Sequence, residues 1–114
     1  EATDLAFQAR LSDSVTISYY SPQGSEKVTF TDPEWQERLA RILETSSYEP
    51  REHCLCVAYP KIEFSNQGKP LGQLSVHHGE KIRAYGSYAK GDYFVGAATG
   101  KAINDLAMEK KPSE

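Results

Sequence analysis

The chain has 114 residues, of which 25% are charged and 39% are apolar, and its formal net charge is −3. This length suits a single domain over residues 1–114, and the composition is that of a globular chain rather than a disordered one. A nucleic-acid binder normally carries a basic stripe that neutralises phosphates, whereas here the basic residues are scattered and outnumbered. We therefore expect no nucleic-acid partner, and residues 1–12 and 110–114 are candidates for loose ends.

The N-terminal sequence bears on the cellular compartment. The chain starts at Glu1 without a methionine, and the polar, acidic run over 1–4 resembles the mature end of an exported protein. An artificial start of the chain would explain the same observation. No stretch approaches the roughly 18 apolar residues that a membrane-spanning helix needs. We expect an extracytoplasmic bacterial protein, periplasmic or secreted, that does not insert into a membrane.

Residues 14–30 predict a β-hairpin. Apolar residues alternate with Thr and Ser over 15–19, and the alternation resumes over 28–30. Between them, Ser21-Pro22-Gln23-Gly24 has the composition of a tight turn. The preceding segment, 2–11, is ambiguous, because its apolar residues fit either a strand or a short helix.

A helix is predicted to begin within 31–34. Thr31 and Glu34 have capping-box spacing, while Asp32 followed by Pro33 is the alternative arrangement of cap and first helical residue. The helix ends over 45–50. Its apolar residues form one stripe: Trp35, Leu39, Ile42 and Leu43.

The C-terminal half predicts short strands and a final helix. A turn is expected at 66–69 and a loop at 86–91. Thr99 can cap the last helix. The expected strands cover 53–59, 61–65, 71–77, 81–85 and 92–95, and the buried stripe of the helix is Ala102, Ile103, Leu106 and the aliphatic stem of Lys110.

The order of these elements predicts the fold class. Strands follow one another in hairpins instead of alternating with helices, which favours antiparallel pairing. We expect an α+β fold in the order β-β-α-β-β-β-β-α. It would have a mainly antiparallel sheet of about five to seven strands and two helices packed on one face.

The apolar residues of the last predicted hairpin fix its register. With Val76 opposite Ile82, both strands turn their apolar side chains to one face, and 78–80 form a three-residue loop. A shift by one residue would set Val76 against Arg83 and mix the two faces. The preferred register sends a polar, aromatic and locally basic set of side chains outward to water: Gln73, Ser75, His77, Lys81, Arg83 and Tyr85.

This outward surface gives the leading functional hypothesis. Tyr and Arg are enriched at interface hot spots, although a sheet face in contact with water is an ordinary feature of antiparallel proteins. We expect a noncatalytic domain that binds another protein or a second copy of itself through this surface. Charge reversal at Arg83 is then expected to abolish binding and leave the fold intact.

The alternative hypothesis is a metal-binding domain. Cys54 and Cys56 supply thiolates, and His77, or alternatively His53 or His78, supplies an imidazole. This ligand set suits zinc or copper. The Cys-x-Cys spacing lacks the two-residue gap typical of zinc knuckles, and buried cysteines often act as small apolar residues. The sequence thus favours a protein without a cofactor and leaves zinc or copper open.

No catalytic motif has the spacing that its chemistry requires. Cys54 and Cys56 lie in a predicted strand without a group that would activate a thiol. The run 96–102 has three residues between its glycines where a phosphate loop has four, and Ala102 replaces the hydroxyl after Lys101. No two carboxylates are spaced as an acid/base pair. We therefore do not expect an enzyme.

Overall fold

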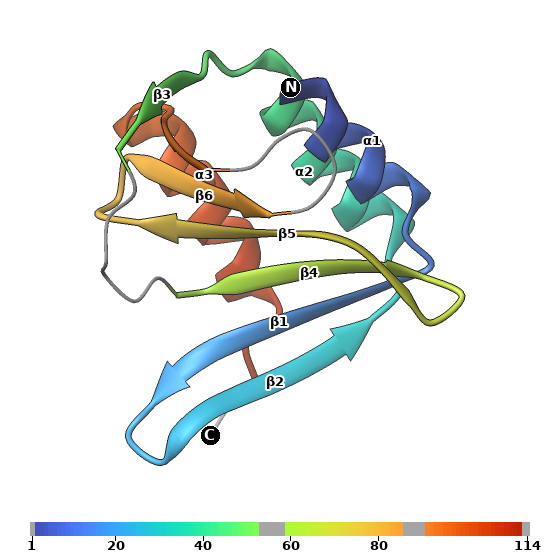
Figure 1. Ribbon diagram of the computed structural model, residues 1–114. Coiled ribbons are helices and arrows are strands. Elements are labelled where there is room, and N and C mark those ends of the chain that lie inside the picture. The colour runs from blue at the N-terminus through green and yellow to red at the C-terminus, as the bar shows by residue number, and fades with distance from the viewer. Residues whose placement is uncertain (1, 53–58, 86–90, 113–114) are drawn as a thin grey trace.

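The computed structural model describes residues 2–52, 59–85 and 91–112. Within them, seven strands form one antiparallel sheet in the order β2-β1-β4-β5-β6-β7-β3. Three helices lie on one face of this sheet, behind it in Figure 1. In chain order the elements are α1 (Ala2–Leu11), β1 (Ser14–Ser21), β2 (Gly24–Phe30), α2 (Pro33–Thr45), β3 (Glu49–Arg51), β4 (Lys61–Asn66), β5 (Lys69–His77), β6 (Lys81–Tyr85), β7 (Gly91–Phe94) and α3 (Ala97–Glu109).

The predicted α+β class and its antiparallel sheet are confirmed. The hairpin over 14–30 is β1 and β2, and the predicted strands from residue 61 onward are β4 to β7 with small shifts at their ends. Gln67 and Gly68 have φ of 52° and 78°, so a two-residue turn in the left-handed region connects β4 to β5. β3 was not expected and pairs with β7 at the end of the sheet. The predicted strand over 53–59 lies, apart from Tyr59, outside the described residues.

The start of α2 resolves the choice between two caps. Asp32 is the N-cap residue, and its Oδ1 accepts a hydrogen bond of 3.1 Å from the backbone N–H of Trp35. Pro33 occupies the first helical position, where its missing N–H costs nothing. The predicted stripe faces the core, because Trp35, Leu39 and Leu43 are buried and Ile42 packs at the edge of the core.

A third helix, α1, forms from the segment that the sequence left ambiguous. Leu5, Ala6 and Ala9 are buried, so the expectation of a loose end over 1–12 is wrong for this helix. The physical reason is long-range. The Gln36 side chain donates hydrogen bonds of 2.8 and 2.9 Å to the carbonyls of Ala9 and Ser12, which satisfies backbone groups where α1 ends.

The last helix, α3, begins earlier than predicted. Its N-cap residue is Gly96 with φ of 93°, and Thr99 lies inside the first turn. The predicted Thr99 cap is therefore wrong, because the chain turns at Gly96, where the Gly96 N–H donates to the Glu80 carbonyl at 3.1 Å. Ile103, Leu106 and Ala107 are buried, and Ala102 is only partly so.

Two buried side chains attach the end of α3 to the rest of the core. The Trp35 Nε1–H donates to the Leu106 carbonyl at 2.9 Å, and the Tyr19 hydroxyl donates to the Ala107 carbonyl. The Trp35 ring also meets Phe30 edge to face at 4.9 Å. β1, β2, α2 and α3 thus share one core, and none of the three described helices lies over the opposite face of the sheet (Figure 1).

Candidate binding surface on the helix-free face

The register of the β5–β6 hairpin is the predicted one. Val76 pairs with Ile82 and His77 with Lys81, which leaves 78–80 as a three-residue loop. His78 and Gly79 have φ of 57° and 72°, so this loop turns through the left-handed region. The side chains expected to point away from the helices therefore do so.

The prediction that this whole face meets water is wrong. Ser75, His77 and Arg83 are 1%, 4% and 7% exposed, so they are buried although none of the described helices lies over this face. Gln73 and Lys81 are half-buried, and Tyr85 is 45% exposed. Of the six predicted surface residues, only Gln73, Lys81 and Tyr85 are therefore accessible to a partner.

A buried ion pair explains how Arg83 is tolerated below the surface. Arg83 on β6 lies opposite Asp92 on β7. The Arg83 Nε and Nη2 donate to the two Asp92 carboxylate oxygens at 2.8 and 3.2 Å, in a bidentate arrangement. These side chains are 8% and 0% exposed, and the hydrogen bond with Asp92 raises the pKa of Arg83. Charge reversal at Arg83 would consequently damage the fold instead of testing a surface.

His77 joins the same buried cluster. Its Nε2 lies 3.5 Å from Oδ2 of Asp92, and its side chain is 2% exposed. Burial lowers the pKa of His77 below its ordinary value of 6.5, and the Asp92 carboxylate opposes that shift. Asp92 was not among the residues predicted for this surface. Pairing the strand over 92–95 with 81–85 would have identified it as the counter-ion of Arg83.

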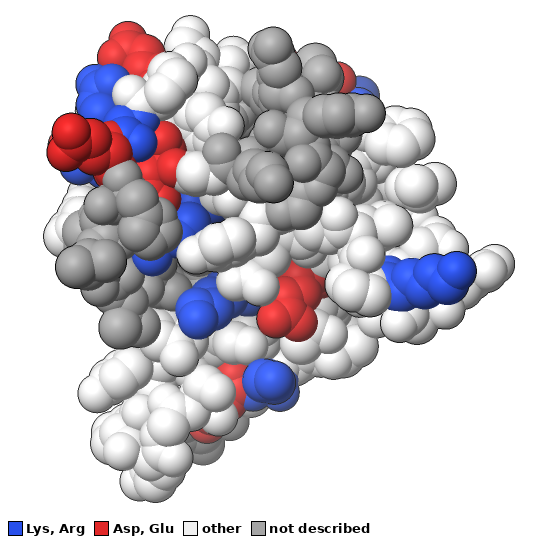
Figure 2. Space-filling view, in the orientation of Figure 1, with Lys and Arg blue, Asp and Glu red and all other residues white. Residues whose placement is uncertain are grey.

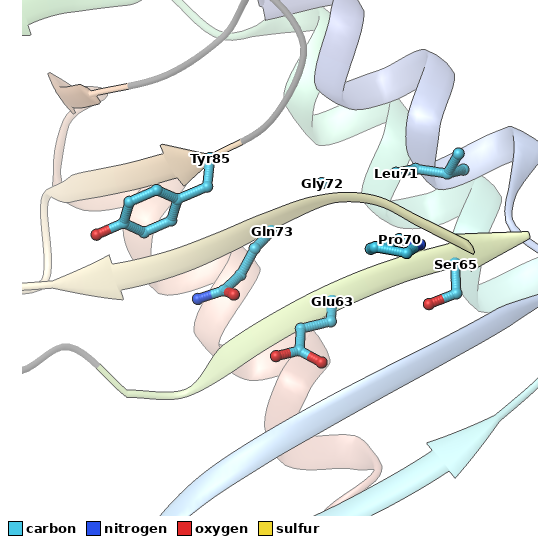
Figure 3. A pocket seen from close by; sticks show the side chains of 7 residues that line it. All are labelled: Glu63, Ser65, Pro70, Leu71, Gly72, Gln73 and Tyr85. Atoms are coloured by element: carbon cyan, nitrogen blue, oxygen red, sulfur yellow. The ribbon is translucent and has the colours of Figure 1, made fainter. Parts of the chain in front are cut away.

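The accessible part of this face contains a hollow of about 390 Å³, shown in Figure 3. Glu63 on β4 and Gln73 on β5 are cross-strand neighbours, and Gln73 is in turn opposite Tyr85 on β6. Their side chains therefore line the hollow from three adjacent strands. The full set of lining residues is Glu63, Ser65, Pro70, Leu71, Gly72, Gln73 and Tyr85.

A β-bulge shapes the apolar wall of the hollow. Phe64 pairs with Gly72 and Ser65 with Pro70, so Leu71 is the extra residue on β5. A bulge bends its strand and redirects side chains, and bulges are common beside functional sites. Pro70 and Leu71 thereby form a wall next to the polar Glu63 and Gln73.

Gly72 fixes the position of α1 beneath the hollow. A Cβ atom at Gly72 would lie 2.1 Å from Oε1 of Gln8 and 2.9 Å from the Tyr85 carbonyl oxygen. Only glycine therefore lets the buried Gln8 side chain of α1 approach the strand so closely. The helix layer and the bulged part of β5 are thus packed directly against each other.

Glu63 is the charged group of the hollow. Its carboxylate makes no ion pair with any side chain among the described residues, and it is half-buried. The nearest cation along the strand, Lys61, places its Nζ 5.2 Å from the centre of the Tyr59 ring. Acidic and basic side chains are interspersed over the described part of this face (Figure 2), so Glu63 does not belong to an extended acidic surface.

Of the predicted metal ligands Cys54, Cys56 and His77, the structure describes His77. Cys54 and Cys56 lie outside the described residues. Among the residues that are described, no three His, Cys, Asp or Glu side chains gather as a metal site. A zinc or copper site at Cys54, Cys56 and His77 stays a prediction.

The fold defines this chain as an antiparallel α+β domain with a helix layer on one side and a partly accessible sheet on the other. Over the described residues, none of the helices has the length and apolar character needed to cross a bilayer. Comparisons with models of protein families, with curated proteins and with solved structures found no match.

Proposed function

We propose that this chain is a noncatalytic binding domain that holds another protein against the helix-free face of its sheet. The observation that carries the proposal is the open hollow at β4 and β5. It combines the apolar surface of Leu71, Pro70 and the exposed Tyr85 with the hydrogen-bonding groups of Glu63 and Gln73. Such a mixture of aromatic, apolar and polar groups is typical of protein–protein interfaces.

The neighbouring polar cluster supports binding rather than catalysis. A general base or nucleophile must reach the group on which it acts, whereas His77 and Asp92 are 4% and 2% exposed. Arg83 and Asp92 also direct their charges toward each other. We therefore assign this cluster a structural role, in which it holds β5, β6 and β7 in register behind the binding surface.

The edge of the sheet is a less suitable interface than its face. β2 forms one end of the strand order, and Lys27 is its central residue. When two copies pair through the same strand in antiparallel orientation, the residue on the two-fold axis faces its own copy. Pairing about Lys27 would oppose two ammonium groups, and pairing about Glu26 would oppose two carboxylates, which is unfavourable.

Helix α1 offers the competing surface. Phe7 and Leu11 are 60% and 47% exposed and lie one helical turn apart. Neither the charges nor the shape of this surface indicates what would cover it. The experiment therefore includes this α1 surface as the alternative site of protein binding.

The test is cross-linking and affinity capture from cells of the source organism, followed by binding measurements on the purified partner. Replacement of two residues that line the hollow, Leu71→Ser and Tyr85→Ser, should abolish capture; Tyr85 is exposed, whereas Leu71 is half-buried and also packs against the core. Met108→Ser is the matched control, because Met108 on α3 is as exposed as Tyr85, at 45% each. Circular dichroism would verify that every variant is folded.

The outcome separates three cases. Loss of one captured protein in both hollow variants, with full capture by the control, supports the proposal. Sedimentation of the purified chain over a range of concentrations shows whether the captured partner is a second copy. Capture that is unchanged in the hollow variants but lost in Phe7→Ser and Leu11→Ser would contradict the proposal and assign binding to α1.

A further inference from the structure

We infer that the hollow accepts a Lys or Arg side chain carried by an extended segment of the partner protein. This inference rests on the proposed function, since it specifies the chemistry of what binds at the same surface. It depends on three features of the hollow, which are its charge, its size and the hydrogen-bonding capacity of its polar groups.

The charge of the lining selects a cation. Among the described residues that line the hollow, Glu63 is the charged one, so the lining carries a single negative charge at neutral pH. The nearby Arg83 charge is balanced by the Asp92 carboxylate, which accepts two hydrogen bonds from it, and Arg83 also interacts with the Tyr85 side chain at the border of the hollow. A partner carboxylate would be repelled by Glu63, while an apolar side chain would desolvate the carboxylate without replacing its hydrogen bonds to water.

The size of the hollow favours an extended segment over a helix. Its walls follow β4 and β5 over 63–65 and 70–73, which is a length of about 10 Å along the strands. A volume of about 390 Å³ lies near the lower end of the range for ligand sites. A helix with its side chains is about 10–12 Å across, so it would cover the hollow without filling it. One long side chain from an extended segment fits along it.

The remaining groups suit a long basic side chain. Its methylene groups would lie along Leu71 and Pro70, as the stems of Lys and Arg do on apolar surfaces. The Tyr85 ring lies on the side of Gln73 away from Glu63 and borders the hollow there (Figure 3). The Glu63 carboxylate, the Gln73 amide oxygen and the Ser65 hydroxyl can accept N–H groups from the charged end.

The experiment uses a library of random linear peptides displayed on phage and selected against the whole chain. Enriched peptides would be synthesised with a fluorophore, and their affinities measured by fluorescence anisotropy at several salt concentrations. The decisive variant is Glu63→Gln, which keeps the shape and removes the charge. Glu26→Gln is the matched control, because Glu26 is an exposed glutamate on β2 and its replacement changes the net charge equally.

We expect the enriched peptides to share a Lys or Arg at one position. Loss of a charge-assisted hydrogen bond should weaken binding about tenfold in Glu63→Gln, and the salt dependence of the affinity should decrease with it. Glu26→Gln should bind as the unmodified chain does. Exchange of the basic peptide residue for glutamine should weaken binding to the unmodified chain but have little further effect on Glu63→Gln.

Other results overturn the inference in distinguishable ways. Peptides that Leu71→Ser and Tyr85→Ser fail to bind, but that contain no common basic residue and ignore Glu63→Gln, would refute the basic side chain and leave the proposed function standing. A selection that yields no peptide would overturn the inference, while the capture experiment decides the proposed function separately. A selection that yields only peptides that bind both hollow variants normally would contradict the inference and the proposed location of binding together.

Discussion

Arg83 and Asp92 form a bidentate ion pair between β6 and β7, with donor–acceptor distances of 2.8 and 3.2 Å, on the face of the sheet opposite the three described helices. The two side chains are 8% and 0% exposed. A pair at this depth has lost most of its hydration, so each charge depends on the other. The predicted solvent-exposed polar face is therefore a buried structural cluster of Arg83, Asp92 and His77, and a small accessible hollow lies beside it.

Replacement of Asp92 by asparagine should destabilise the chain strongly. It leaves the Arg83 charge buried without its counter-ion, and breaking a buried pair in this way costs about 3–5 kcal/mol. The measurement is urea unfolding followed by the fluorescence of the buried Trp35. The double variant Arg83→Met with Asp92→Leu should be more stable than Asp92→Asn, because apolar replacement of both partners removes the unpaired charge.

The exposed Arg41 provides the control for that measurement. Arg41→Met removes a cation from a side chain that is 75% exposed, and surface substitutions usually have small effects. Should Asp92→Asn prove no more destabilising than Arg41→Met, the buried pair would have no structural importance.

His77 should make stability depend on pH in a defined window. Because burial lowers its pKa below 6.5, the unfolded chain binds a proton at a higher pH than the native chain does. The free energy of unfolding is therefore complete above pH 6.5 and falls as the pH decreases through the lowered pKa. The His77→Gln variant should lose this slope between pH 6.5 and 4.5, measured by urea unfolding at a series of pH values.

The carboxylates whose pKa values are lowered by ion pairs with Arg or Lys contribute in a different range. Hydrogen bonds from Arg10 and Arg41 lower the pKa of Glu37 from 4.5 to about 2, and the stability that this shift supplies is lost only below pH 4.5. The exposed His78 is present in both proteins. Equal slopes above pH 4.5 in the original chain and in His77→Gln would show that His77 titrates normally in the fold.

Gly100→Ala should destabilise the chain although it lies inside a helix. Alanine in a helix interior is ordinarily more favourable than glycine by about 1 kcal/mol. Here the added Cβ would lie 2.1 Å from the Gly79 carbonyl oxygen, because the tip of the β5–β6 hairpin packs directly on α3. Overpacking of this kind costs about 1–3 kcal/mol. Lys101→Ala, at the next and exposed position, is the control, and a stabilised Gly100→Ala would refute the close contact.

Metal removal should leave the fold and the peptide binding unchanged. The Nε2 atom of His77 lies 3.5 Å from Asp92 inside the buried cluster, so its use as a ligand would require that cluster to rearrange. Elemental analysis of chain purified without chelator, and unfolding with and without a chelator, provide the measurement. Stoichiometric zinc or copper whose removal lowers stability, and whose binding Cys54→Ser abolishes, would instead support the metal hypothesis.

Long-range contacts decide both the structure of segment 2–11 and the start of α3, where the local sequence pattern did not predict them. Segment 2–11 has no decisive periodicity of its own, and it forms α1 because Gln36 caps its end and the core accepts Leu5 and Ala9. Gly96 replaces the predicted Thr99 cap because the distant Glu80 carbonyl accepts its N–H. Neither contact leaves a pattern in the local sequence.

The sequence by itself determined the hairpins, the start of α2, the antiparallel class and the facing of β5 against β6, because periodicity and turn residues act over a few neighbours. The tertiary structure alone decided which outward side chains are accessible. Alternation places Arg83 and Tyr85 on the same face, but in the folded chain the Arg83 side chain, paired with Asp92, is 8% exposed, while Tyr85 is 45% exposed. Burial depends on every atom that surrounds a side chain, and those atoms come from residues far away along the chain.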